Sequence, residues 1–207
     1  MRKGFGIFCI ILGMCCLLSS LGLTVYNHRA DEKAQDTSES ILQDIRESMQ
    51  DISEEENRSE DSGREEPAAI PAEGPKEMLT AQVDGYDCIG VLSVPVLELE
   101  LPVLTDWNYE KLKTAPCHYF GSCYEKNFVI AAHNFQSHFG RLSELQSGDL
   151  ILFTDISGTV HGYEVVLLET LPANATEEMI TSGFDLSLYT CTPGGASRVT
   201  VRCNAVA

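Results

Sequence analysis

Three side chains in the C-terminal half of the sequence could together carry out acyl transfer through a thioester. Cys191 ends the run LYTC, Arg198 follows after a short loop, and His133 lies far upstream in the run AAHN. A thiolate can attack a carbonyl carbon, an imidazole can move protons, and a guanidinium can stabilise the charge that builds on the oxygen. Because the three residues are distant in sequence, the fold must bring them together.

The positions of these residues favour a site over a purely structural role. A free cysteine in a strand is usually a small core residue. Cys191, however, ends a predicted strand before a Pro-Gly-Gly turn, and the next strand begins with Arg198. A nearby cation favours the thiolate form, which is the nucleophile. His133 follows an apolar run and so also lies at a strand end.

Arg202 is the alternative to Arg198, since residues four apart in a strand share a face. The shorter distance along the chain to Cys191 favours Arg198. The other histidines of the domain, His118, His138 and His161, fit structural roles better, and His161 is expected to be exposed in a hairpin turn.

A metal site is disfavoured by the spacing of the possible ligands. Cys117, His118, Cys123, His133 and His138 carry suitable atoms, but their separations do not match the usual zinc motifs. No metal and no cofactor is therefore expected.

Disulfide pairing is left open by the sequence. The cysteines outside the N-terminal apolar stretch are odd in number, so at least one thiol is free outside the cytosol. A Cys117–Cys123 bond is one possibility, and sequence does not decide any pairing among Cys88, Cys117, Cys123 and Cys203.

The elements that must position the site are predicted to be short strands. From Tyr86 onward, short apolar runs alternate with turn residues. Two short helices are expected at Asn108–Lys113 and Thr176–Ile180. Many short strands with few helices indicate an all-β, closed or nearly closed β-barrel over residues 86–207. The predicted strands are Cys88–Val94, Leu99–Leu104, Phe128–Ala132, Leu150–Thr154, Tyr163–Glu169, Leu186–Thr190 and Arg198–Cys203.

The N-terminal region predicts a membrane anchor followed by a linker. Residues 5–26 carry no charge and as a helix would span roughly 33 Å, enough for a hydrocarbon core. Basic residues before the span and acidic ones after it place residues 1–4 in the cytoplasm and the rest outside. A cleaved signal peptide is the alternative, but its apolar part should be shorter.

Residues 27–85 are expected to form an acidic, flexible linker. One apolar stripe within them, from Ile41 to Ile52, has helical spacing and is expected to be transient or to dock on a partner. The net charge of −17 makes nucleic acid a poor partner.

These motifs resemble those of the sortases, the membrane-anchored cysteine transpeptidases of Gram-positive bacteria. The run ending at Cys191 resembles the family's Thr-Leu-x-Thr-Cys signature, with Ser187 in place of the first Thr, and His133 and Arg198 match the catalytic histidine and arginine. The resemblance covers roughly residues 86–203 and implies a sortase-like closed barrel of about eight strands.

The resemblance also implies substrates and partners. Exported proteins with a C-terminal, LPxTG-like sorting signal would be cleaved through a Cys191 thioester, and Thr190 would shape the groove or donate a hydrogen bond to the substrate. An amine on a peptidoglycan precursor or another protein would accept the acyl group. The absence of an Asp-Pro-aromatic motif in residues 31–85 and of a second apolar span argues against the pilin-polymerising class.

Two alternatives stay open. A hydrolytic cysteine peptidase on the same fold would use water in place of the amine. A non-catalytic tethered binding domain would keep Cys191 as a buried, inert residue.

Overall fold

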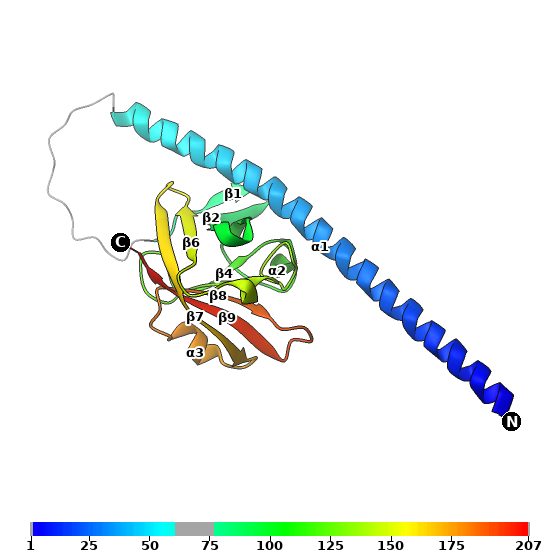
Figure 1. The fold of residues 1–207 in the computed structure, drawn as a ribbon. Helices are drawn as coiled ribbons and strands as arrows, with labels where there is room; N and C mark the ends of the chain where they lie inside the picture. Colours follow the sequence, from blue (N-terminus) through cyan, green and yellow to red (C-terminus); the bar gives the residue numbers. More distant parts are fainter. Residues whose placement is uncertain (1, 61–76, 207) are drawn as a thin grey trace.

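The computed structural model describes residues 2–60 and 77–206, with side chains described for residues 6–8, 10–50 and 77–206. The predicted linker therefore lies partly outside the described residues, between 61 and 76. Within the described part, a long N-terminal helix lies against a β-barrel (Figure 1).

The barrel is built from one sheet with the strand order β1-β2-β3-β4-β5-β8-β9-β7-β6, closed by pairing of β2 with β6. Strand β1 pairs only with β2 and lies outside the closed ring, so eight strands form the barrel. The predicted closed barrel is thereby confirmed. The strands are β1 (Ala81–Val83), β2 (Tyr86–Val94), β3 (Leu99–Leu104), β4 (Cys117–Phe120), β5 (Phe128–Ala131), β6 (Leu150–Asp155), β7 (Val160–Pro172), β8 (Leu186–Cys191) and β9 (Ser197–Ala205).

Two strands were missing from the prediction. β1 has three residues and β4 has four, and both contain polar residues, so neither forms an apolar run that a pattern could reveal. Both segments are strands because they pair with longer neighbours, β1 with β2 and β4 with β5.

The short helices lie in the connections between strands. Helix α2 (Lys111–Thr114) begins later than predicted, and the side chain of Asn108 in the turn before it accepts hydrogen bonds from the N–H groups of Glu110 and Lys111. Helix α3 (Thr176–Ile180) matches its predicted range. Two 3₁₀ turns, Pro95–Leu97 and Leu142–Glu144, complete the elements.

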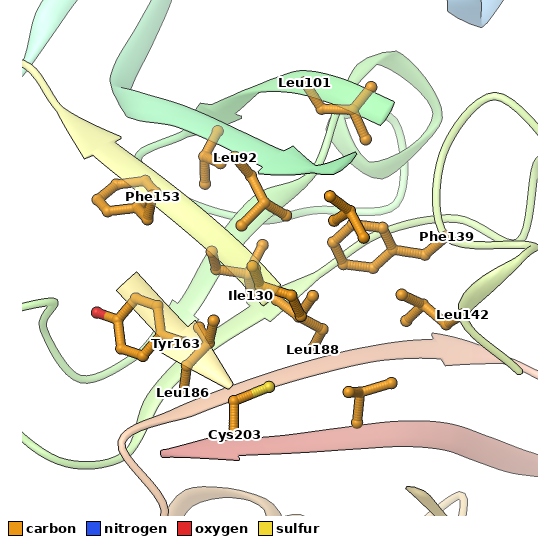
Figure 2. Packing of buried hydrophobic residues seen from close by; sticks show 14 of the residues in the cluster. Leu92, Leu101, Ile130, Phe139, Leu142, Phe153, Tyr163, Leu186, Leu188 and Cys203 are labelled. Atoms are coloured by element: carbon orange, nitrogen blue, oxygen red, sulfur yellow. The ribbon is translucent and has the colours of Figure 1, made fainter. Parts of the chain in front are cut away.

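The barrel interior holds the main core (Figure 2). Ile130 of β5 and Leu188 of β8 point into it, surrounded by side chains from the other strands and from the loop that carries Phe139. Because side chains alternate along a strand, Cys191 points away from this core on the opposite face from Leu188. The alternation thus keeps the thiol outside the barrel interior.

Helix α1 (Arg2–Glu60) is the main departure from expectation. The sequence predicts a flexible linker from residue 27, but the helix continues through this region and lies against β1, β3 and α2. Ile41 and Ile45 are fully buried and pack in a second cluster with Cys88, Leu104 and Cys117. The apolar stripe explains the order, because burying it offsets the entropy cost that a purely polar linker could not meet.

The first part of α1 has the opposite character. Its large apolar residues from Ile7 to Tyr26 are exposed, and its N-terminal end projects well beyond the barrel (Figure 1). This part is long and apolar enough to cross a membrane, so α1 is a candidate membrane span that continues directly into the docked segment.

Candidate functional site

Cys191 and Arg198 face each other across the β8–β9 pair. The antiparallel register matches the two residues directly, so their side chains share one face of the sheet. The connecting turn closes through a hydrogen bond from Thr192 N to Ser197 O at 3.0 Å. Gly194 and Gly195 both have positive φ, which suits glycine and allows so tight a turn. The short loop therefore places Arg198 directly opposite Cys191 in the sheet.

The guanidinium of Arg198 is held by carbonyl groups of the turn that precedes it. Nη1 donates hydrogen bonds of 3.1 Å to the carbonyl oxygens of Gly195 and Ser197. Because both acceptors are neutral, the positive charge stays available to an anion that develops near Cys191.

Strand β5 brings His133 to the same place. It runs parallel to β8 with Ala131 opposite Tyr189, and the N–H of Ala132 donates to Tyr189 O at 3.2 Å. Continued by two residues beyond the end of β5, this register places His133 alongside Cys191. The three candidate residues thus lie at the ends of adjacent strands, as the strand-end positions in the sequence suggested.

Thr190 fastens these two strands together. It is almost fully buried, and its Oγ1 donates a 2.9 Å hydrogen bond to Ala132 O, the residue before His133. The predicted role of Thr190 in substrate binding stays a prediction, since this hydroxyl already has a partner within the protein.

The His133 ring is oriented by packing. It lies edge-to-face on Phe135, with ring centroids 4.2 Å apart, and no hydrogen bond joins its imidazole to another described residue. Burial lowers the pKa of His133, the Lys113 ammonium lowers it further, and the Asp31 carboxylate opposes both.

Arg202 is held in a different environment. It is 2% exposed, and its guanidinium donates to Glu169 Oε1 at 2.8 Å, to Ser187 Oγ at 2.8 Å and to Glu178 O at 2.9 Å. Arg202 is paired with Ser187 in the β8–β9 register, and it therefore lies away from the end of β8 that carries Cys191. Of the two arginines, Arg198 is therefore the one beside the thiol.

A hollow of about 250 Å³ adjoins Cys191. Asn134, Phe139 and Gly140 from the loop after β5 line one part of it, and Pro193 and Val199 line another. Such a hollow next to the thiol is suited to part of an extended peptide.

A row of aromatic rings also adjoins the site, and sequence reasoning missed it. Tyr189 shares the outer face with Cys191 and contacts Tyr119, and Tyr119 in turn contacts Trp107. Trp107 and Tyr109 are exposed at the end of the row. Trp107 and Tyr109 are close together in the sequence, but only the folded barrel brings this aromatic pair near Tyr189.

Three other cysteines of the domain are poor nucleophiles. Cys88, Cys117 and Cys203 are buried, and burial raises the pKa of each to about 12. Cys117 is a free thiol, so the possible Cys117–Cys123 disulfide is not formed in the structure. Cys191 differs from the buried cysteines in being partly exposed.

The residues that were weighed and disfavoured as zinc ligands form no cluster of potential ligand atoms among themselves in the described part of the chain. Both ring nitrogens of His118 lie near carbonyl oxygens, those of Thr105 and Gly121. His138 is fully buried without a hydrogen-bond partner for either ring nitrogen. Burial lowers the pKa of His138 to about 4, so this ring is neutral.

A different trio, Cys123, Asp155 and His161, has its potential ligand atoms within 4.8 Å of one another. The Asp155 carboxylate already accepts hydrogen bonds from Tyr124, Ser157, Thr159 and His161. Burial raises its pKa, but these bonds outweigh burial and the net shift is downward. Asp155 and His161 thus belong to a hydrogen-bonded network of the β6–β7 hairpin, which Tyr124 joins from the loop before β5. His161 is partly buried there, which corrects the expectation of full exposure.

Comparison with known proteins agrees with the barrel and its site. A family model described as Sortase domain matches residues 92–206. No curated protein sequence shows a significant match. Among solved structures, sortase A from Corynebacterium diphtheriae is 22% identical with a TM-score of 0.54, covering 59% of this chain and 62% of that chain. This chain therefore spans about three fifths of that sortase.

Two further structures extend the likeness. Sortase C1 from Streptococcus suis is 25% identical with a TM-score of 0.51, over 58% of this chain and 73% of that one. Sortase C-3 from Streptococcus pneumoniae is 21% identical with a TM-score of 0.54, over 86% and 91% respectively. Sortases of class A and of class C thus both share this fold, and the subclass of this chain stays a prediction. Since the family model covers more than half of its length, the chain belongs to the sortase family.

Proposed function

We propose that the protein is a cysteine transpeptidase that cleaves a C-terminal, LPxTG-like sorting signal of exported proteins. The observation that carries the proposal is the strand register, which matches Cys191 to Arg198 and brings the end of β5, with His133, alongside Cys191. In this proposal Cys191 is the nucleophile, His133 the proton carrier and Arg198 the oxyanion partner.

The first half-reaction forms a thioester. The Cys191 thiolate attacks the carbonyl carbon of the scissile peptide bond, and Arg198 stabilises the negative charge on the carbonyl oxygen. As the C–N bond breaks, His133 in its imidazolium form gives a proton to the departing amine. The low pKa of His133 makes its imidazolium a stronger acid for this step.

The second half-reaction reverses these roles. An incoming amine attacks the thioester carbonyl, the new C–N bond forms, and the Cys191 thiolate leaves. The neutral His133 then accepts the proton that the amine loses. The accepting amine belongs to a peptidoglycan precursor or to another protein.

The surroundings of the thiol support a peptide substrate. The hollow beside Cys191 offers space for an extended chain, and the Tyr189–Tyr119–Trp107 row offers apolar ring faces next to it. The acidic charge of the protein, −17 overall, argues against a nucleic-acid partner.

The location that suits this function is the cell membrane. The proposal assigns residues 5–26 to a single span with the N-terminus in the cytoplasm and the catalytic barrel outside. Exported substrates would then emerge beside the enzyme, which raises their effective concentration at the site.

The test uses the full-length protein in detergent and a panel of sorting peptides. Mass spectrometry is expected to find an acyl adduct on Cys191, and none in Cys191→Ala. Cys123→Ala, which changes a thiol at the other end of the barrel, is the matched control and should still form the adduct. No adduct with any peptide, while Cys191 reacts with an alkylating reagent, would contradict the proposal.

The same assay separates the alternatives. A product that contains the added amine, such as a glycine peptide, marks a transpeptidase, whereas release of the free acid with or without amine marks a hydrolytic peptidase. A Cys191 that resists alkylation in the folded protein would favour the non-catalytic binding domain.

A further inference from the structure

Helix α1 contacts the loop that follows the candidate catalytic histidine. The carboxylate of Asp31 accepts hydrogen bonds from the N–H of Gln136 at 3.2 Å and of Ser137 at 3.1 Å, and also from the Ser137 hydroxyl. These bonds join residues more than a hundred positions apart. Asp31 therefore anchors the loop to the helix that carries the candidate membrane span.

The loop itself is tightly folded, so a contact at one point affects the rest. The N–H groups of His138 and Gly140 both donate to Phe135 O, and the N–H of Phe139 donates to His133 O. A side chain at Gly140 would meet the carbonyl oxygens of Asn134 and Phe135 at 2.7 Å. Such close packing leaves the loop few alternative conformations.

Phe135 connects the anchored part of the loop to His133. It immediately precedes the two residues that donate to Asp31, and its ring lies edge-to-face on the His133 imidazole at 4.2 Å. No hydrogen bond from a described residue orients this imidazole. The orientation of His133 therefore depends on Phe135, and the position of Phe135 depends on the loop that Asp31 fixes.

We propose that Asp31 is a positioning residue for His133, acting through the loop from Asn134 to Ser137. This inference rests on the proposed function, since it assigns His133 a proton-transfer role. It also links the anchor to the site, because Asp31 lies only about 7.5 Å of helix beyond Tyr26. Docking of α1 thus holds the active-site loop close to the end of the candidate span.

The test compares three substitutions in the full-length protein in detergent. Asp31→Ala removes the acceptor, Asp31→Asn keeps an acceptor oxygen without the charge, and Asp36→Asn is the matched control at an exposed acid of the same helix. Three quantities are measured: kcat and KM for peptide cleavage, hydrogen exchange of the Gln136 and Ser137 amides, and the pKa of His133 by NMR.

For Asp31→Ala we expect kcat to fall about tenfold with KM within twofold, because a small displacement of a catalytic group slows the chemical step. Exchange of the two amides should accelerate. The pKa of His133 should fall, since Asp31 opposes the lowering by burial and by Lys113, while the buried His138 stays neutral. Cys191 and Arg198, which the strand register places near His133, are unchanged in this variant. Asp36→Asn should match the wild type in all three.

Asp31→Asn separates positioning from charge. We expect it to keep the amides protected and to recover most of kcat, although the pKa of His133 still falls. If it loses as much kcat as Asp31→Ala while its amides stay protected, only the charge matters and positioning is overturned. Phe135→Leu should abolish most of the effect of Asp31→Ala on kcat, because the proposed route passes through that ring.

A purely structural role for Asp31 in docking α1 gives a different pattern. Arg46→Ala removes another polar contact of α1 with the barrel, the ion pair with Glu100, away from the loop. A kcat that falls as far in Arg46→Ala as in Asp31→Ala overturns the proposal. Unchanged His133 pKa and amide exchange in Asp31→Ala overturn it as well, whatever the wild type does to peptides. If Asp31→Ala changes the His133 pKa and the amide exchange while the wild type forms no acyl adduct, only the proposed function is refuted.

Discussion

At the scale of single residues, burial and hydrogen bonding separate side chains that the sequence presents as equivalents. Arg198 and Arg202 lie on one strand, yet Arg202 is bound to Glu169, Ser187 and Glu178 while Arg198 contacts only carbonyl groups of its own turn. The cysteines divide in the same way, since Cys191 is partly exposed and Cys88, Cys117 and Cys203 are buried.

The two arginines should respond differently to substitution. Arg198→Ala is expected to lower kcat/KM about 10²- to 10³-fold, the usual effect of removing an oxyanion donor, with little change in the free energy of unfolding. Arg202→Met should instead destabilise the fold by about 3 kcal/mol, because it leaves the carboxylate and hydroxyl partners of a buried cation unpaired. Peptide-cleavage kinetics and denaturant unfolding distinguish the two. Equal losses of activity at similar stability would contradict the assignment.

His138 should make the protein less stable in acid. Its pKa is about 4 in the folded protein and about 6.5 in an unfolded chain, so the unfolded state binds the proton first as the pH falls. The stabilisation is therefore complete above pH 6.5 and is lost between about pH 6.5 and 4, by about 3 kcal/mol.

The matched variant is His138→Phe, which keeps an aromatic ring where neither ring nitrogen has a partner. Urea unfolding at several pH values should show a smaller loss of stability from pH 6.5 to 4 than in the wild type. An identical slope in both proteins would show that other groups cause the acid sensitivity.

At the scale of elements, the site depends on the pairing of β5, β8 and β9. The parallel β5–β8 pair sets the position of His133, and the antiparallel β8–β9 pair sets that of Arg198. A single side-chain bond, from Thr190 to Ala132 O, reinforces the first pairing where β5 ends. The connecting loop and α1 then fix the residues beyond that end.

Thr190 gives a direct test of this arrangement. Thr190→Val should cost about 1 kcal/mol of stability through the lost hydrogen bond, and should lower kcat about tenfold because the chain at His133 is less firmly held. Thr190→Ser keeps the hydroxyl and should retain most of the activity. If Thr190→Val raises KM and leaves kcat unchanged, Thr190 acts mainly in substrate binding, as the family resemblance implied.

At the scale of the whole molecule, α1 joins a candidate membrane span to the sortase barrel as one continuous helix. From Ile7 to Tyr26 the helix is uncharged and exposes its large apolar residues, whereas its docked part is acidic and buries an apolar stripe against the barrel. The barrel therefore has a defined attachment to the helix of the candidate span through Asp31, Ile41 and Ile45, in place of the flexible linker that the composition suggested.

The proposed orientation in the membrane can be tested with the native thiols. A membrane-impermeant maleimide added to intact cells should label Cys191, because the other domain cysteines with described side chains are buried. Cys191→Ala should abolish most of that labelling. Labelling of Cys191 only after the cells are permeabilised would place the barrel in the cytoplasm and contradict the proposed topology.

The sequence by itself determined the closed barrel, seven of its strands and the apolar N-terminal segment, and it predicted Cys191, His133 and Arg198 as the candidate site, with Arg202 as the alternative arginine. These features follow from local patterns, namely alternating apolar residues, turn residues and short motifs. It did not determine which arginine lies beside the thiol, since residues four apart on a strand share a face and only the register of β9 separates them.

Tertiary structure alone decided the contacts made between distant segments. Strands β1 and β4 are ordered by their neighbours, the aromatic row forms only when the barrel closes, and the acidic segment from residue 27 is helical because the barrel covers its apolar stripe. The contact of Asp31 with the loop after His133 belongs to this class as well. Its physical reason is the same, because an exposed carboxylate in a polar segment acquires a defined partner only when the helix that carries it is docked.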